Sequence, residues 1–351
     1  MSAMKFKRQN ISGAMVFIVA ILVSLSFINL YGAEKKSLEK KTVKQPKLFS
    51  QFGRVEKNDP KFEKLFSSDS IVEKVAEGFV CAQSCLFAKN IVLISDTGSN
   101  IIYSWDENNG LKIFQRLRVY STNLTALYGP AGIAKDQSAK ILICHHGDRR
   151  ILKLENSNRL VSIADYFNWL RFNGPYGIAV KSNGDVYFTD PPFDAIEPGV
   201  NSPNKEMTYN GIYRITKNGY VDLLSTKLDC PMGLAFSPKE DYLYVVNQTE
   251  SAPAVMRIAL KKDGTLEKPE LFYNLSSVLS QKKGEIGGIA IDASGNIYVA
   301  TPGGILAIDQ QGKQLGSILT DQPATSCGFG NNGKYLYITT RNSLCRVRTA
   351  N

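Results

Sequence analysis

Acidic, amide and imidazole side chains close several predicted strands of this 351-residue chain. Asp96, Asp190 and Asn247 each follow a β-branched or aromatic run, and the neighbouring pair His145 and His146 follows another. Carboxylates and amides at strand ends can bind a divalent cation or the polar atoms of a substrate. The chain has two histidines in all, so zinc sites built from dispersed histidines and the HExxH motif are excluded.

The six cysteines show no CxxC pair. We expect most of them to be small buried hydrophobic side chains, because unpaired cysteine is among the most buried residue types. In an exported chain, Cys81 and Cys85 could instead pair with each other.

An internal repeat supplies the elements that must position these side chains. Each copy has a glycine, a short apolar run, a polar turn and an alternating β-branched and aromatic run, and a third strand follows. Strands at this spacing, with a period of about 50 residues, indicate radially packed sheets. The sequence therefore predicts an all-β fold, a six-bladed β-propeller over residues 67–351. The copies begin at Gly78, Gly132, Gly177, Gly233, Gly288 and Gly328.

The last copy has no room for a fourth strand after Leu344–Val347. An unpaired sheet edge recruits other chains, so another segment must cover it. Ser70–Ala76, just before the first copy, is placed to close the ring. With its ring closed in this way, we expect the propeller to be a monomeric domain.

In such a fold the innermost strand of each blade starts at one end of the central channel, and the second strand returns to that end. The residue before each repeat glycine should therefore ring the mouth of the channel. The predicted inner ring is Glu77, Ala131, Tyr176, Met232, Gly287 and Cys327. The predicted wider ring is Asp96, His145 or His146, Asp190, Asn247, Thr301 and Thr340.

The inner ring is a poor calcium site. Calcium takes about six to eight oxygen ligands with several carboxylates among them, whereas this ring offers one carboxylate, Glu77. As the one acid at that level, Glu77 could act as a general base. In the wider ring, Asp96, Asp190 and Asn247 could hold a displaced ion or bind polar substrate atoms.

Each of these side chains also has a plainer alternative. Asp96 and Asp190 could cap turns by accepting backbone N–H groups. The histidine pair could be structural and hydrogen-bonded, and Met232 and Cys327 could serve packing alone.

The amino-terminal part of the chain separates into three segments. Residues 1–13 are basic, residues 14–33 are mostly apolar, and residues 34–66 form a polar, Lys-rich linker. About 20 apolar residues span a bilayer as a helix, so we favour a single uncleaved transmembrane helix over a cleaved signal peptide. The sequence thus predicts a single-pass membrane protein or an exported one, with the propeller on the extracytoplasmic side.

The positive charge belongs to these amino-terminal segments. The formal net charge of the chain is +10, and residues 1–66 hold thirteen Lys and Arg against five acids. The rest keeps 29 bases and 27 acids, a net charge of +2. A nearly neutral domain has no footprint for a phosphate backbone, so nucleic acid is not an expected partner.

Several short motifs lie along the repeat. They are Ala76-Glu77-Gly78, Cys144-His145-His146-Gly147-Asp148, Arg171-Phe172-Asn173-Gly174-Pro175, Tyr187-Phe188-Thr189-Asp190-Pro191-Pro192 and Pro231-Met232-Gly233-Leu234. Through these motifs, residues 71–349 resemble the senescence-marker-protein and gluconolactonase family of six-bladed propellers. The resemblance implies a lactone or ester hydrolase with a divalent cation, usually calcium or zinc, at the channel mouth. It also implies that Glu77 is a metal ligand and that Arg171 helps to hold the substrate.

Three further ligands that the resemblance implies do not carry over. Tyr176 and Met232 stand where the family has asparagine, and Gly287 stands where it has the aspartate that also acts as base. One of four expected ligands therefore remains, and calcium or zinc would need a shifted site.

Two functions stay open at this point. The first is hydrolysis of lactones or esters, with Glu77 and Asp190 catalytic, Glu77 and Asp96 on a metal ion, and Arg171 stabilising the developing oxyanion. The second is a catalytically degenerate, metal-free propeller that binds a small-molecule ligand or a protein partner. The predicted substrate-binding residues are Arg171, Tyr176, Met232, Asn247, His145 and Cys327.

Overall fold

The computed structural model describes residues 49–350, apart from 68, 118–128, 157, 193–204, 250 and 283. These residues are mostly β-strand, with two short helices, and they form one compact unit from Phe49 onward. No helix in this described part is long and apolar enough to cross a membrane. The predicted transmembrane segment, residues 14–33, lies outside the described residues.

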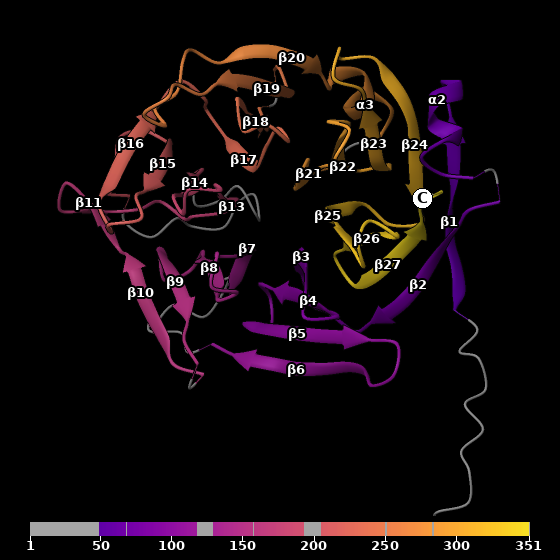
Figure 1. Cartoon of the computed structure of the whole chain (residues 1–351), viewed down its shortest axis with the longest axis horizontal. Coiled ribbons are helices and arrows are strands. Elements are labelled where there is room, and N and C mark those ends of the chain that lie inside the picture. The colour runs from indigo at the N-terminus through magenta and orange to yellow at the C-terminus, as the bar shows by residue number, and fades with distance from the viewer. Residues whose placement is uncertain are drawn as a thin grey trace, which may run out of the picture. The chain divides into compact units, whose positions relative to one another are not determined.

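Four separate antiparallel sheets of four strands follow one another along the described chain. They stand in a ring, with the first strand of each sheet nearest the centre (Figure 1). The first two sheets are β3 Ala82–Ala88, β4 Ile91–Asp96, β5 Ile101–Asp106, β6 Gly110–Arg116, and β7 Pro130–Lys135, β8 Ile141–His145, β9 Arg150–Leu154, β10 Leu160–Ala164. The next two are β13 Ile178–Val180, β14 Val186–Asp190, β15 Gly211–Ile215, β16 Val221–Ser225, and β17 Pro231–Phe236, β18 Tyr242–Asn247, β19 Ala254–Ala259, β20 Glu270–Asn274.

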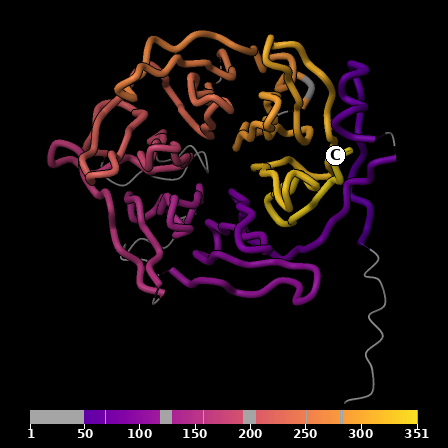
Figure 2. The backbone as a smooth tube through the Cα atoms, in the orientation of Figure 1, coloured from indigo at the N-terminus to yellow at the C-terminus, as the bar shows by residue number. Residues whose placement is uncertain are grey.

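A nine-stranded sheet completes the ring. It contains two further runs of four strands, β21 to β24 and β25-β26-β27-β2, which β1 joins. The tube in Figure 2 follows the chain once around the ring before the last strands meet β2. The bounds are β1 Ser50–Lys57, β2 Ile71–Glu77, β21 Ile289–Ile291, β22 Ile297–Thr301, β23 Gly304–Ile308, β24 Gln314–Thr320, β25 Ala324–Gly330, β26 Tyr335–Thr340 and β27 Ser343–Arg348.

The described chain is therefore an all-β propeller, as the repeat predicts. β2 covers the edge of the last run, with Val72 opposite Val347, which is the closure expected of Ser70–Ala76. The remaining elements are the small hairpin β11 Tyr166–Phe167 and β12 Leu170–Arg171, and the helices α2 Pro60–Glu63 and α3 Ser276–Gln281.

Residues 50–66 correct the predicted linker, because they are folded. β1 adds a strand between β2 and β24, with Val55 opposite Ile318. Phe62 and Phe66 are fully buried, and the Phe66 ring meets Tyr298 at a centroid distance of 6.1 Å. The segment is predicted to be a linker because it is rich in lysine. Phe62 and Phe66 nevertheless bury enough apolar surface to hold a short strand and helix against the propeller.

Glycine at the start of the inner strands allows neighbouring sheets to approach closely. A Cβ atom built on Gly132 would meet the Tyr176 carbonyl oxygen at 2.2 Å, and one on Gly177 would meet the Met232 carbonyl oxygen at 2.5 Å. The repeat glycines therefore mark where strands of adjacent sheets touch along the channel.

We expect Gly132→Ala to lower the free energy of unfolding by roughly 1–3 kcal/mol, because the methyl group must push two sheets apart. Gly303→Ala is the matched control, since its nearest neighbour would be the Thr301 hydroxyl oxygen at 3.8 Å. Denaturant unfolding of both variants measures the difference, and equal stabilities would contradict the close-approach argument.

Candidate functional site

The strand register defines the mouth of the channel. Ala82 pairs with Asp96, Pro231 pairs with Asn247, and Ala324 pairs with Thr340. Each pair joins the start of an inner strand to the end of the second strand of the same sheet. The residue that follows the paired one on each inner strand therefore occupies the same level of the channel in every sheet. The ring at the mouth consists of Gln83, Ala131, Tyr176, Met232, Gly287 and Thr325.

The structure corrects two members of the predicted inner ring. Glu77 ends β2 opposite Ser343, is largely exposed, and pairs with Lys74 at 2.5 Å between Nζ and Oε2. Cys327 lies two residues beyond the ring position and lines the channel below it. The structure therefore does not bring Glu77 to the positions predicted for a base or a metal ligand.

Sequence reasoning missed Gln83 and Thr325. The step from ring residue to strand end is 14 or 15 residues in four repeats (131 to 145, 176 to 190, 232 to 247, 287 to 301), but 19 from 77 to 96. That excess was a usable signal against Glu77. For Thr325 the signal was absent, because Gly328 resembles a repeat glycine and the pairing of Ser326 with Thr339 decides the register.

Side chains seal the mouth. The Tyr176 hydroxyl donates to Gln83 Oε1 at 3.0 Å, and Met232 is 1% exposed beside them. Burial raises the pKa of Tyr176, so its hydroxyl is neutral at pH 7. Below this seal, the channel holds a cavity of about 110 Å³ lined in part by Cys85 and Cys327.

The acidic and amide residues of the wider ring hold backbone. The Asp96 carboxylate accepts from the N–H groups of Val80 and Cys81, at 3.0 and 2.7 Å. Asn247 Oδ1 accepts from the Cys230 N–H at 3.0 Å. These contacts fix the segments that lead into β3 and β17. Asp96 therefore plays the turn-capping role that the sequence analysis gave as its alternative to ion binding.

Asp190 plays the same part before β13. Its two carboxylate oxygens accept from the N–H groups of Asn173 and Gly174 at 2.8 and 2.7 Å. Burial raises the pKa of Asp190 to about 7, against the opposing effect of these two hydrogen bonds. A proton held near neutrality is useful in catalysis, but this carboxyl group is fully buried and already holds backbone.

His145 is a buried neutral residue. Its Nδ1 accepts from the Asp148 N–H at 3.1 Å, and burial lowers its pKa to about 4. Nε2 is buried and has no hydrogen-bond partner among the described residues. The ring is 0% exposed, so its environment is entirely protein.

Arg171, at the end of the β11–β12 hairpin, is already engaged in hydrogen bonds within the protein. Its Nη2 donates to the Asp148 carbonyl oxygen at 2.7 Å, and its backbone N–H donates to Glu206 Oε2 at 2.8 Å. Arg149, which is buried, donates to the carbonyl oxygens of Arg171 and Phe172. These bonds tie the sheet that contains β9 to the segment that enters β13.

Glu285 is a carboxylate near the mouth that the sequence analysis did not single out. It precedes Ile286, whose backbone N–H donates to Gln248 Oε1 at 2.9 Å, and the ring residue Gly287. Burial is the main cause of the raised pKa values of Tyr176 and Cys81, and the negative charge of Glu285 adds to both. Burial is the larger cause at Cys81 and raises the pKa of that thiol to about 11. Glu285 lies two residues before Gly287, so no spacing rule pointed to it.

The donors at the mouth do not fit a divalent cation. Asp96 uses both oxygens on backbone N–H groups, and Glu77 lies outside the ring. At Gly287 an added Cβ would meet the Thr325 carbonyl oxygen at 2.0 Å, so this backbone has no room for an aspartate. Within the described residues, no three His, Cys, Asp or Glu side chains are grouped to hold a metal ion.

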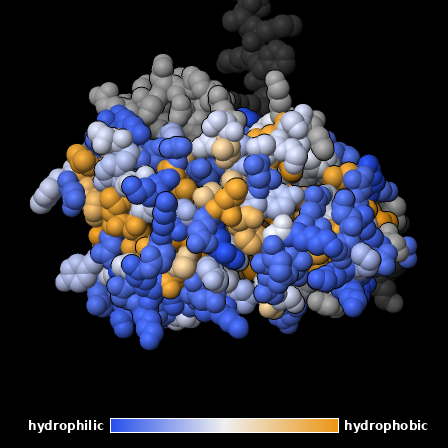
Figure 3. Space-filling model, turned by 90° about the horizontal axis from the view of Figure 1, so that it is seen from above, coloured by the Kyte–Doolittle hydropathy of each residue, from blue (hydrophilic) through white to orange (hydrophobic). Residues whose placement is uncertain are grey.

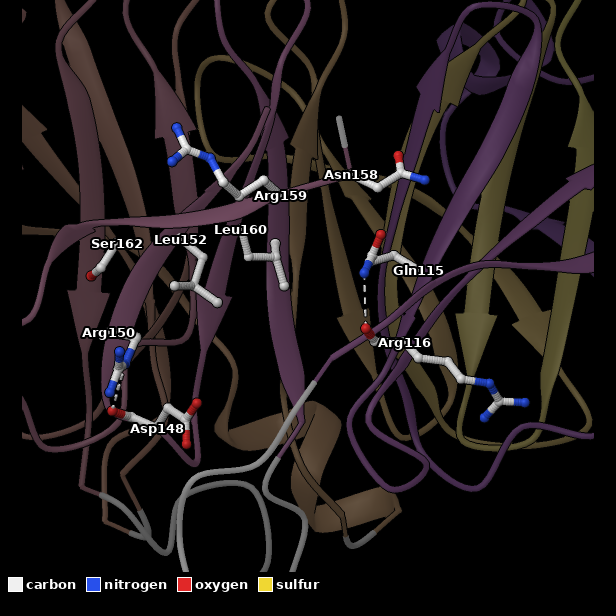
Figure 4. A pocket seen from close by; sticks show the side chains of 9 residues that line it. All are labelled: Gln115, Arg116, Asp148, Arg150, Leu152, Asn158, Arg159, Leu160 and Ser162. Atoms are coloured by element: carbon white, nitrogen blue, oxygen red, sulfur yellow. Dashed lines mark hydrogen bonds between the residues drawn. The ribbon is translucent and has the colours of Figure 1, made fainter. Parts of the chain in front are cut away.

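The outer surface carries a separate groove. It encloses about 650 Å³ between β6 and the β9–β10 pair, with Arg116, Arg150 and Arg159 at its edges. The guanidinium groups of Arg116 and Arg159 point away from each other (Figure 4), so they do not converge on one anion.

The side of the molecule seen in Figure 3 is mainly hydrophilic, with hydrophobic residues in small groups. We therefore keep the mouth as the candidate site.

Comparison with known proteins gives consistent matches. Residues 76–342 match the family model described as the SMP-30/Gluconolactonase/LRE-like region. A gluconolactonase from Zymomonas mobilis is 29% identical over 98% of this chain and 97% of its own. The structure of a gluconolactonase from Xanthomonas campestris matches with a TM-score of 0.76 and 23% identity, over 88% of this chain and 99% of that one. A calcium-binding regucalcin from Agrobacterium tumefaciens matches with a TM-score of 0.61 and 17% identity, over 78% and 94%.

His145 should make the fold sensitive to acid. Its pKa is lowered from 6.5 in the unfolded chain to about 4 in the fold, so its contribution is complete above pH 6.5 and is lost as the pH falls toward 4. We expect His145→Gln to remove up to about 3 kcal/mol of the pH dependence across this window. Denaturant unfolding at several pH values measures it.

The raised pKa of Asp190 acts in the opposite direction, since it disfavours folding as the pH rises toward 7. Asp190 is present in both the unmodified chain and His145→Gln. The difference between their free energies of unfolding at each pH therefore isolates the contribution of His145. Identical pH profiles for the two proteins would show that His145 does not titrate in this way.

Proposed function

The chain belongs to the SMP-30/gluconolactonase/LRE-like family, and on that basis we propose that it is a six-bladed propeller that binds a small uncharged ligand, such as a lactone, at its mouth. The two runs of the nine-stranded sheet count as separate blades, because β1 alone joins them. With the four separate sheets they make six.

One observation carries the proposal, namely that the six ring positions at the mouth, all of them among the described residues, hold no charged side chain. The Tyr176 hydroxyl and the Gln83 amide meet across it, and Met232 packs beside them. Burial keeps the Tyr176 hydroxyl and the Cys81 thiol protonated. The hydroxyl, the amide and the two sulfur-containing side chains are all uncharged. Such a set suits an uncharged lactone ring with polar oxygen atoms better than it suits an ion.

The same groups argue against metal-dependent hydrolysis at this mouth. The ligands that the family resemblance implies are replaced at Tyr176, Met232 and Gly287, and Glu77 lies on β2. Activation of water by a bound cation needs several ligands and an open coordination position. We therefore propose that the chain binds a ligand at this mouth but does not hydrolyse it with a bound metal ion.

Hydrolysis is the second candidate, because the gluconolactonase from Zymomonas mobilis matches 98% of this chain. In that case Glu285 is the residue that we assign as general base, since it is the carboxylate whose charge acts on the mouth hydroxyl of Tyr176. Asp190 is less suited, because both of its oxygens hold backbone N–H groups.

We also propose that residues 14–33 anchor the chain in a membrane, on the hydropathy of that segment. Resistance of the full chain to alkaline carbonate extraction from membranes tests this anchor. Release into the soluble fraction would contradict it.

The ligand proposal is tested with the full chain in detergent and a panel of aldonolactones and γ-lactones. We expect calorimetry to show binding of at least one lactone and a pH-stat to show no turnover above the uncatalysed rate, with or without calcium, zinc or manganese. Tyr176→Ala should weaken binding about tenfold by removing the mouth hydroxyl and ring. Glu77→Gln is the matched control and should bind normally, because Glu77 lies exposed on β2.

Two outcomes would overturn the proposal. Failure of every lactone to bind would remove the ligand class. Turnover that disappears in Glu285→Gln would establish the hydrolase instead.

A further inference from the structure

A small hairpin, β11–β12, on the outer edge of the ring beside β10 and β16 (Figure 1) displays large side chains to solvent. Trp169, at the tip between β11 and β12, is 96% exposed, and Tyr166 and Leu170 beside it are 54% and 37% exposed. The other tryptophan, Trp105, is 3% exposed. A tryptophan that contacts almost nothing in its own fold contributes little to folding, so its surface is available to another phase or molecule.

The backbone at this tip is strained. Asn168 and Trp169 have φ angles of 50° and 67°, the left-handed values of a two-residue hairpin turn. Asparagine tolerates such a φ angle, whereas a bulky residue does so rarely. Glycine would fit the turn without strain. The sequence therefore keeps a tryptophan where local structure alone favours a smaller residue.

The base of the hairpin is rigid. The Phe167 ring meets Tyr213 at 5.5 Å, and the buried Phe172 ring meets Phe188 and Tyr213 at 5.1 Å. The Arg171 backbone N–H is held by Glu206. These contacts hold the hairpin in a fixed orientation. Tyr166 and Leu170 lie on opposite faces of it, because Tyr166 pairs with Arg171 and Leu170 pairs with Phe167.

The hairpin and the entry of the chain belong to the same end of the propeller. The hairpin directly precedes the segment that enters β13 from the mouth. β1 begins with Ser50 opposite Lys74, in the part of β2 nearer the mouth, and runs away from it to Arg54 opposite Ile71. Residues 34–48, between the predicted membrane segment and the described chain, can reach at most about 50 Å.

We propose that the hairpin is an interfacial membrane anchor, in which Tyr166, Trp169 and Leu170 enter the headgroup region of a lipid bilayer and hold the mouth face toward it. Tryptophan and tyrosine favour this region because each has an apolar ring and a polar hydrogen-bonding group. The proposal rests on the membrane anchor proposed for residues 14–33, since a tether of about 50 Å at most keeps the propeller within reach of the bilayer.

The test uses the full chain reconstituted in phosphatidylcholine and phosphatidylglycerol vesicles, with and without brominated acyl chains. The sequence has two tryptophans, so the emission of the unmodified chain minus that of Trp169→Phe gives Trp169 alone. We expect brominated lipid to reduce this difference roughly twofold, as contact with the interface requires. The Trp105 emission that remains in Trp169→Phe should not change, because Trp105 is buried.

Trp105→Phe provides an independent measurement of the same signal. Quenching of Trp169 by aqueous iodide but not by brominated lipid would overturn the proposal and favour a soluble partner. Carbonate extraction of the same vesicles reports on residues 14–33 separately, so failure of that anchor and failure of the hairpin are distinguishable.

Discussion

The close approach of the inner strands around the channel is the constraint on which the rest of the structure depends. At the mouth, a donor from one sheet repeatedly reaches the backbone carbonyl group of the next, and glycine leaves the space for it. The bonds run from Ser95 to Ala131, Gly132 to Tyr176, Thr189 to Met232, Gly288 to Thr325 and Thr325 to Ala82. The last of these joins the end of the chain to its first inner strand, so the ring closes through hydrogen bonds as well as through β2.

This closure decides what the polar residues at the mouth can do. The segments that enter the inner strands carry backbone N–H groups that sheet pairing does not satisfy, and Asp96, Asp190 and Asn247 accept from them. A carboxylate committed to two backbone donors is not available to a cation or a substrate. The acids that look most functional in the sequence are therefore largely structural, and the ring positions in the described part of the mouth hold neutral side chains.

The neutral ring positions at the mouth and the exposed β11–β12 hairpin both differ from what family membership alone implies. Tyr176 and Met232 stand where the resemblance implies metal ligands, while the negative charge of Glu285 adds to the burial that raises the pKa of Tyr176. The hairpin with Trp169 lies at the same end. A ligand that reaches the mouth would meet the uncharged side chains of Gln83, Tyr176 and Met232, on a face that we propose to turn toward a membrane.

The sequence by itself determined the repeat, the all-β propeller and the closing role of the strand before the first copy, because alternation and turn residues are local properties of the chain. It also predicted Tyr176, Met232 and Gly287 at positions that the strand register makes equivalent, since strand and turn lengths are nearly constant in those repeats. Only the tertiary structure decided that Gln83 replaces Glu77 in the ring and that residues 50–66 are folded. Register depends on which backbone groups pair, and burial of Phe62 and Phe66 depends on partners far away in the chain.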